Sequence, residues 1–96
     1  MPDPQIIGVN QMVAQIQGNI VSDMNGEKVM LSVKNGKYYN MGVIGGEIWE
    51  KIRNPVMISQ VVDALLLEYE VSRDECEQQV VSFIEMLAKE GLVEVK

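Results

Sequence analysis

Short stretches of alternating apolar and polar residues follow residue 19 and predict antiparallel β-strands. Two pairs, Asn25-Gly26 and Asn35-Gly36, interrupt the alternation. An Asn-Gly pair suits a tight hairpin turn because both residues tolerate positive φ angles. Three strands joined by two such turns form a meander, and its last strand, residues 37 to 41, is expected at an edge of the sheet.

The middle strand of this meander has two faces that differ in composition. Val29, Leu31 and Val33 share one face, whereas Lys28, Met30 and Ser32 share the other. Successive side chains of a strand point to opposite sides of the sheet. We therefore expect one of the two faces to pack on the core.

Helical periodicity replaces the alternation after Gly42, which is a permissive N-cap. Three helices are predicted. The first ends before Pro55, and the third opens with Ser72 and Glu75 at capping-box spacing and stops at Gly91. Their apolar stripes are Ile44, Ile48, Trp49 and Ile52; Ile58, Val61, Val62, Leu65, Leu66 and Tyr69; and Cys76, Val80, Phe83, Ile84 and Leu87.

The two ends of the chain have weaker patterns. Residues 1 to 10, with two prolines and a glycine, are expected to form a flexible arm, and residues 11 to 96 a single domain. Residues 9 to 16 fit either a strand or a short helix, and residues 92 to 95 fit a short closing strand. The predicted fold is α+β and winged helix-turn-helix-like, with a three-stranded antiparallel meander followed by three helices.

Fourteen acidic residues against eight basic ones give the chain a net charge of −6. This charge repels phosphate backbones and anionic headgroups, so neither nucleic acid nor a membrane is an expected partner. The first residues lack both a basic segment and a long apolar run, so we expect no signal peptide and no membrane span. The cytoplasm is the expected location.

Few residues offer catalytic chemistry. The chain has no histidine, and its one cysteine, Cys76, lies at core spacing on the third predicted helix. Gly45-Gly46 lacks the spacing of a phosphate-binding loop, and the acidic cluster of Asp74, Glu75 and Glu77 lacks that of a calcium loop. We expect no catalytic residue, no metal and no cofactor.

The predicted edge strand has two interpretations. An exposed edge offers free N–H and C=O groups to which a peptide can add as a further strand, while a neighbouring groove recognises its side chains. Alternatively, Tyr39 and Met41 only fill the core and Lys37 only protects the edge. The pattern alone leaves both open.

An ordered set of residues resembles the PqqD-like family, peptide chaperones also called RiPP recognition elements, and within it the small stand-alone members of lasso-peptide gene clusters. The resemblance covers about residues 20 to 95, and no single motif in it is decisive. The residues that carry it are Val29 to Val33, Gly36, Tyr38, Tyr39, Met41, Gly45, Ile48, Trp49, Pro55, Tyr69, Val71, Phe83, Leu87 and Gly91 to Val93.

The resemblance implies a non-catalytic protein that binds the leader of a ribosomally made precursor peptide and presents it to a separate leader peptidase of the cysteine-protease type. It implies that the leader adds as a strand to the third strand and lies in a groove against the third helix. Carried over by position, the peptide-binding residues are Lys37, Tyr38, Tyr39, Asn40 and Met41 on the strand and Cys76, Gln79, Val80 and Phe83 on the helix.

Two positions depart from the family pattern. Gly42 stands where an asparagine is expected and still permits a helix cap. Met57 stands where a serine or threonine usually caps the second helix, so we expect that helix to fray at its start.

Two other functions use the same elements. A DNA-binding winged helix predicts basic residues on a recognition helix, but the third helix carries Arg73 and Lys89 against five acidic residues. A subunit that completes a larger enzyme would instead have its edge strand covered by protein. The chain is expected to be a monomer or a weak homodimer, since an unpaired edge can pair with its own copy.

Overall fold

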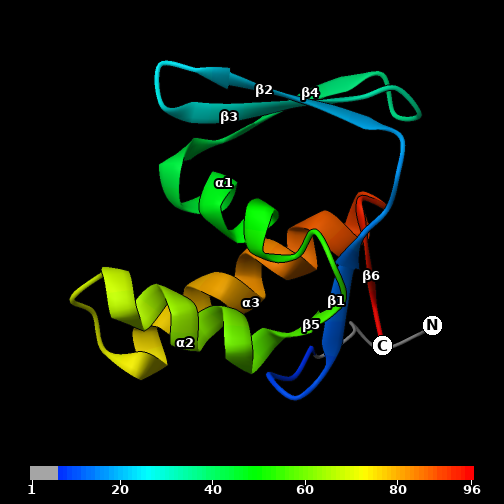
Figure 1. Ribbon diagram of the computed structural model, residues 1–96. Helices are drawn as coiled ribbons and strands as arrows, with labels where there is room; N and C mark the ends of the chain where they lie inside the picture. The colour runs from blue at the N-terminus through cyan, green and yellow to red at the C-terminus, as the bar shows by residue number, and fades with distance from the viewer. Residues whose placement is uncertain (1–6) are drawn as a thin grey trace.

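The computed structural model describes residues 7–96 and contains two small antiparallel sheets and three helices (Figure 1). Chain order gives β1 (Met12–Gln15), β2 (Asn19–Met24), β3 (Glu27–Ser32), β4 (Lys37–Met41), α1 (Gly42–Lys51), β5 (Val56–Met57), α2 (Ile58–Glu68), α3 (Arg73–Lys89) and β6 (Val93–Val95). The predicted fold class is confirmed: a three-stranded antiparallel meander is followed by three helices.

The meander pairs its strands in the order β2-β3-β4, as the two Asn-Gly pairs predict. Asn25 and Gly26 have φ angles of 58° and 86°, and Gly36 has a φ of 66°. Asn25 and Gly26 therefore form a tight two-residue turn, whereas β3 and β4 are joined by residues 33 to 36, in which Gly36 is the one left-handed residue. The sheet therefore takes its register from local turn chemistry, which the sequence displays.

The face of β3 that packs on the core is the one with Lys28, Met30 and Ser32, which the alternation alone did not identify. Met30 and Ser32 are fully buried, whereas Val33 is 64% exposed. The Lys28 and Met30 side of the strand lies on α1, where the Lys28 methylenes cover Gly46. Both faces of β3 carry apolar residues, so alternation identified the two sets but not which of them meets the helices.

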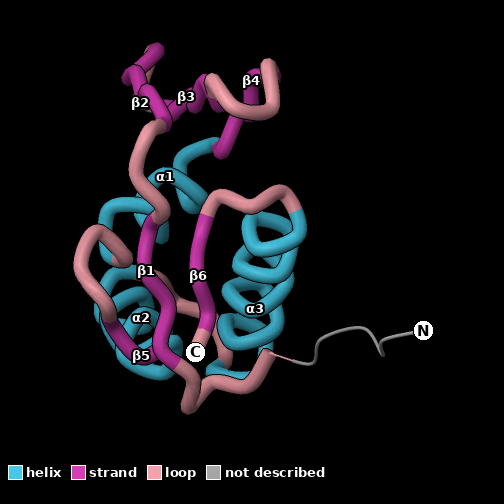
Figure 2. The backbone as a smooth tube through the Cα atoms, turned by 90° about the vertical axis from the view of Figure 1, so that its right-hand side faces the viewer, coloured by secondary structure: helices cyan, strands magenta, loops and turns pink. Residues whose placement is uncertain are grey.

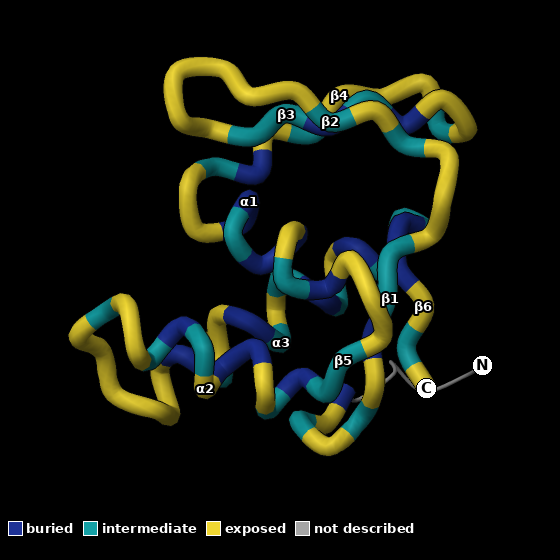
Figure 3. Tube along the Cα trace, viewed as in Figure 1, coloured by how far each residue is buried: buried dark blue, intermediate teal, exposed yellow. Residues whose placement is uncertain are grey.

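The outer face of the meander consequently carries exposed apolar side chains. Ile20, Leu31 and Tyr38 lie opposite one another across the three strands. Tyr38 is 75% exposed, and Ile20 and Val33 are exposed as well. Figure 3 shows the same contrast, with buried residues gathered among the helices, β1 and β6.

A second sheet joins both ends of the chain to the segment before α2. Its order is β5-β1-β6, so the strand alternative for residues 9 to 16 is confirmed at Met12–Gln15 and the closing strand at Val93–Val95. Figure 2 shows β1 and β6 side by side, with α3 on one flank. This sheet completes the core around Val13 and Val93.

The first N–H groups of α2 have hydrogen-bond partners, which argues against the expected fraying. Although Met57 offers no side-chain cap, its own N–H donates to the Gln60 side chain at 3.1 Å. The N–H groups of Ile58 and Ser59 donate to the backbone carbonyls of Gln11 and Val9. Carbonyls from the segment before β1 thus satisfy the first N–H groups of the helix.

The same contacts bear on the predicted arm, whose residues 1 to 6 lie outside the described residues. Ile7 is buried, and Val9 packs against the core and accepts the hydrogen bond from Ser59. Residues 7 to 10 are therefore in contact with the domain. The boundary between an arm and the domain at residue 10 stays a prediction.

The start of α1 differs in detail from the expectation. The N-cap is Met41 rather than Gly42, and Gly42 opens the helix with a φ of 70°. The Asn40 side chain accepts a hydrogen bond from the Gly42 N–H at 3.0 Å. Lys28 pairs with Gly42 while Val29 pairs with Asn40, so Met41 is an extra residue on β4 and marks a β-bulge where the chain leaves the sheet.

Within residues 7–96, none of the helices has the length and apolar character needed to cross a membrane.

Adding a side chain at Gly46 is predicted to destabilise the protein. A methyl group there would lie 2.9 Å from Lys28 Cγ and 3.0 Å from Lys28 Cβ. We expect Gly46→Ala to lower the free energy of unfolding by about 1–3 kcal/mol despite the better helix propensity of alanine, measured by urea denaturation. Gly8→Ala, which meets nothing within 4 Å, is the control, and equal stabilities of the two variants would contradict the close approach.

Candidate functional site

Within residues 7–96 the meander has two edge strands, β2 and β4, because each pairs only with β3. In Figure 2, β4 lies on the same side of the molecule as α3, and β2 lies on the other side. Met41 and Phe83 both lie within about 3 Å of the place where a Gly45 side chain would start. The end of β4 and the middle of α3 therefore meet at the first turn of α1.

The five predicted strand residues alternate in exposure along β4. Tyr38 and Asn40 are exposed on the outer face, although the Asn40 side chain is already bonded to Gly42. Tyr39 is half-buried and Met41 is buried, so these two side chains belong to the core. Lys37 is exposed and lies 3.6 Å from Glu90. What this edge offers a peptide is mainly its backbone, together with Tyr38 and Lys37.

The four predicted helix residues take different positions. Cys76 and Val80 are buried, Gln79 is exposed and Phe83 is half-buried against Gly45. Cys76, Gln79 and Val80 line a cavity of about 60 Å³ between α1 and α3, which we call the α1–α3 pocket. Phe83 does not line this pocket but lies between it and β4.

Several residues of the α1–α3 pocket were not predicted as site residues. Its other walls are Ile44 and Ile48 of α1, Leu65 of α2, and Tyr69 and Val71 after α2. Ile44 belongs to the predicted apolar stripe of the first helix, yet its side chain is 38% exposed. An apolar residue that helical spacing assigns to the core looks the same in sequence whether it is covered or lines an open pocket.

Hydrogen bonds hold the rim of the pocket. Tyr69 Oη donates to a Glu47 carboxylate oxygen at 2.9 Å, which ties the end of α2 to α1. This hydrogen bond, with burial and the nearby charge of Glu47, raises the pKa of Tyr69. Neither Arg73 nor Asp63 lines the pocket; their ion pair, at 2.8 Å, ties the start of α3 to α2.

A polar cluster joins the start of β4 to the end of α3. Tyr39 Oη donates to Glu90 Oε1 at 2.6 Å, and Asn35 Nδ2 donates to Tyr39 Oη at 3.1 Å and to the Glu90 carbonyl at 2.8 Å. The Tyr39 hydrogen bond, followed by the charge of Lys37, holds the pKa of Glu90 below its usual range. Neither Asn35 nor Glu90 was predicted, because a contact across 55 positions leaves no local pattern.

Cys76 has no activating partner in the structure. Burial raises the pKa of its thiol, with a smaller opposite effect from Arg73. A raised pKa keeps the thiol protonated and unreactive. Among residues 7–96 there is also no group of three or more acidic or cysteine side chains placed to hold a metal ion.

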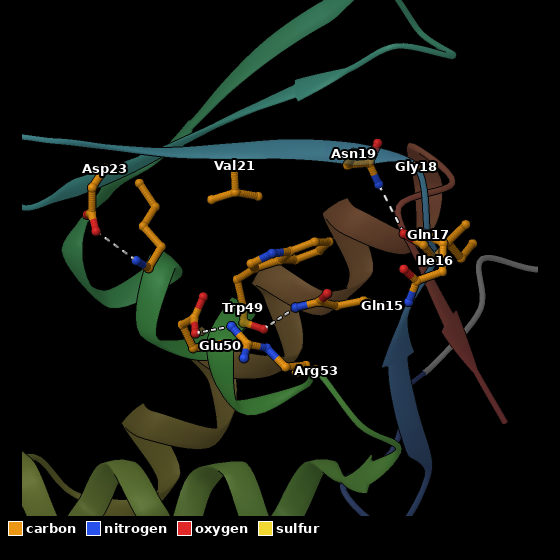
Figure 4. A pocket seen from close by; sticks show the side chains of 11 residues that line it. Gln15, Ile16, Gln17, Gly18, Asn19, Val21, Asp23, Trp49, Glu50 and Arg53 are labelled. Atoms are coloured by element: carbon orange, nitrogen blue, oxygen red, sulfur yellow. Dashed lines mark hydrogen bonds and ion pairs between the residues drawn. The ribbon is translucent and has the colours of Figure 1, made fainter.

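A larger polar cavity of about 290 Å³ lies between β2 and α1 (Figure 4). Trp49 forms part of its wall beneath Val21. Its charged groups are paired locally: Lys28 Nζ lies 3.3 Å from Asp23, and Arg53 lies 2.8 Å from Glu50. Because each of these charges already has a partner of opposite sign, the cavity does not present an unpaired charge from these four residues to a ligand.

Comparison with known proteins agrees with this arrangement. The sequence profile of the family described as Coenzyme PQQ synthesis protein D (PqqD) matches residues 27–93, which is more than half of the chain. The chain belongs to the PqqD family. A search among curated proteins gave no match.

Three solved structures resemble this PqqD-family chain. TbiB1, solved in complex with the TbiA(beta) leader peptide, is 26% identical, with a TM-score of 0.76 over 84% of this chain and 94% of TbiB1. Lasso peptide synthetase B1, solved with a leader peptide, is 20% identical, with a TM-score of 0.75 over 85% of this chain and 96% of that one. The PqqD part of Methylobacterium extorquens PqqCD, described as a RiPP recognition element, is 13% identical, with a TM-score of 0.79 over 95% and 97%.

The buried thiol of this PqqD-family protein leads to a reactivity prediction. We expect Cys76 to react with a thiol reagent at pH 8 at least roughly tenfold more slowly in the native protein than in denaturant, because the native thiol is covered and has a raised pKa. The reaction can be followed by absorbance. Gln78→Cys adds a thiol at an exposed position of α3 as a control. Equally fast reaction of the two native thiols would show that Cys76 is accessible.

Proposed function

We propose that this protein binds the leader of a ribosomally synthesised precursor peptide by strand addition to β4 and presents it to a separate maturation enzyme. The observation that carries the proposal is the free edge of β4 beside α3 and the α1–α3 pocket, in a chain that shares its fold and 26% identity with TbiB1. TbiB1 was solved with a leader peptide, which is the ligand class we assign to this protein.

The backbone of β4 would supply most of the binding. In an antiparallel pair, alternate residues of an edge strand direct their N–H and C=O groups away from the sheet. A peptide that pairs with those groups places every second side chain toward α3. Gln79, Phe83 and the mouth of the α1–α3 pocket would meet these side chains, which favours a leader with an apolar residue at that register.

The absence of an evident reactive group in residues 7–96 favours an accessory role over an enzymatic one. Cleavage of the leader would then belong to another protein, and we assign this step to a leader peptidase of the cysteine-protease type that acts in trans. Since two of the similar structures are a B1 protein and a lasso peptide synthetase B1, we place the protein in lasso-peptide biosynthesis. We further propose a cytoplasmic protein that is a monomer or a weak homodimer.

A direct test is a fluorescence-anisotropy titration with a labelled leader from the precursor encoded nearest to this protein. We expect saturable binding in the micromolar range or tighter, and no saturation with a scrambled leader. Equal binding of both peptides, or binding of neither, would exclude leader recognition and favour a subunit that is covered by another protein.

Strand addition predicts a backbone effect at Tyr38. Proline lacks the N–H group, so Tyr38→Pro should weaken leader binding roughly tenfold or more if this amide pairs with the leader. Tyr38→Ala retains the N–H and removes the same side chain, which makes it the matched control. Circular dichroism confirms that each variant folds. Equal affinities of the folded proline and alanine variants would argue against pairing at Tyr38.

Recognition by the pocket predicts an effect at Ile44. Ile44 lines the α1–α3 pocket, whereas the adjacent Val43 is 54% exposed and does not. We expect Ile44→Ser to weaken leader binding roughly fivefold to tenfold and Val43→Ser to leave the affinity near that of the wild type, measured by the same titration. Similar losses in both variants would mean that the pocket is not the site of recognition.

A further inference from the structure

Polar contacts gather where β4 approaches the end of α3. Tyr39, Lys37 and Asn35 all reach Glu90, the C-cap residue of the helix. The Tyr39 phenol and the Lys37 ammonium share one oxygen of its carboxylate, at 2.6 Å and 3.6 Å. Asn35 donates to both the phenol oxygen and the Glu90 carbonyl, so the β3–β4 turn joins the same cluster.

The position of Glu90 is unfavourable for a carboxylate in isolation. The C-terminal end of a helix carries partial negative charge, which repels an acidic side chain. Here the phenol hydrogen bond and the Lys37 charge offset that repulsion, and the Glu90 side chain is only 26% exposed. Charge-assisted hydrogen bonds of this kind are shorter and stronger than neutral ones. The Tyr39–Glu90 hydrogen bond is therefore the main tie between strand and helix, and the exposed Lys37 adds a smaller, solvent-screened contribution.

This tie has an apolar counterpart at the other end of β4. Met41 and Phe83 pack around Gly45, which fixes the last residue of the strand relative to α3. The two ties reach α3 at Phe83 and at Glu90, so they hold β4 beside the C-terminal half of this helix. The distance between β4 and α3 is thus set at both ends of the strand. At its start the side chains of Tyr39 and Lys37 contact Glu90, and at its end Gly45 lets Met41 and Phe83 approach each other.

We propose that Glu90 is a positioning residue for leader binding: by holding Tyr39 and Lys37 it fixes the start of β4 at the distance from α3 that the leader strand requires. This proposal rests on the function proposed above. Glu90 need not touch the leader. Without its carboxylate, the first residues of β4 would remain paired with β3, and of the contacts in this cluster only the Asn35 hydrogen bond to the backbone carbonyl of residue 90 would be left.

The test compares Glu90→Ala and Tyr39→Phe with the wild type in two measurements. The first is leader affinity, by anisotropy with the labelled leader. We expect each variant to weaken binding roughly fivefold to twentyfold, and the double variant to weaken it no more than the stronger single variant, because both remove the same tie. Glu90→Gln, whose amide oxygen can still accept from the phenol, should retain part of the affinity.

The second measurement is amide hydrogen exchange of the free protein at residues 37 to 41. We expect exchange there to be several times faster in Glu90→Ala, with α2 unchanged. Asp63→Ala is the matched control, because it removes the Arg73 ion pair that ties the same helix to α2, away from β4. This variant should leave both β4 exchange and leader affinity unchanged.

The two measurements separate this proposal from the proposed function. Failure of the wild type to bind the leader would overturn the function and with it a positioning role in leader binding, while exchange would still report whether Glu90 holds β4. With a wild type that binds, unchanged affinity in Glu90→Ala and Tyr39→Phe would overturn the positioning role alone, whatever the exchange rates. An equal loss of affinity in Asp63→Ala would also overturn it, by showing a general effect of loosening α3.

Discussion

The close approach of α1 to its neighbours at Gly45 and Gly46 is the constraint on which the rest of the structure depends. Gly46 lets the Lys28 methylenes of β3 lie directly on the helix, and Gly45 does the same for the Phe83 ring of α3. Two adjacent positions of one helix therefore face a sheet on one side and a helix on the other. Any side chain beyond a hydrogen atom would push one of them away.

The position of the meander follows from this contact. With β3 seated on α1, Met30 and Ser32 become buried and the opposite face of the sheet is left to solvent. The same seating brings β4 to the side of α3, where Tyr39 reaches Glu90. The proposed peptide edge is therefore a consequence of helix packing, and no residue of β4 needs to be special for the edge to exist.

Much of the fold could be predicted because local chemistry determines it. The two Asn-Gly pairs define the turns, Ser72 caps α3 through the Glu75 N–H, and Gly91 ends that helix with a φ of 77°. What could not be predicted depends on contacts between distant segments. The buried face of β3 depends on Gly46, and the intact start of α2 depends on carbonyls of Val9 and Gln11. Neither contact leaves a periodic signal.

The candidate site likewise contains residues that local sequence predicts and residues that only contacts between distant segments bring together. The strand from Lys37 to Met41 was predicted with its observed bounds, because a turn precedes it and a helix follows. The pocket residues Ile44, Tyr69 and Val71 and the cluster at Glu90 were not, because they become neighbours only when three helices and a sheet have packed. The roles of all these residues in peptide binding rest on the proposals above.

Trp49 has a practical consequence that concerns spectroscopy. It is the only tryptophan in the chain, and it lies in the wall of the polar cavity between β2 and α1. Its fluorescence therefore reports on one place, the joint between the meander and the helices. Any movement of the sheet on α1 would alter the surroundings of the indole ring. The protein thus carries an intrinsic optical probe at the joint that its architecture depends on.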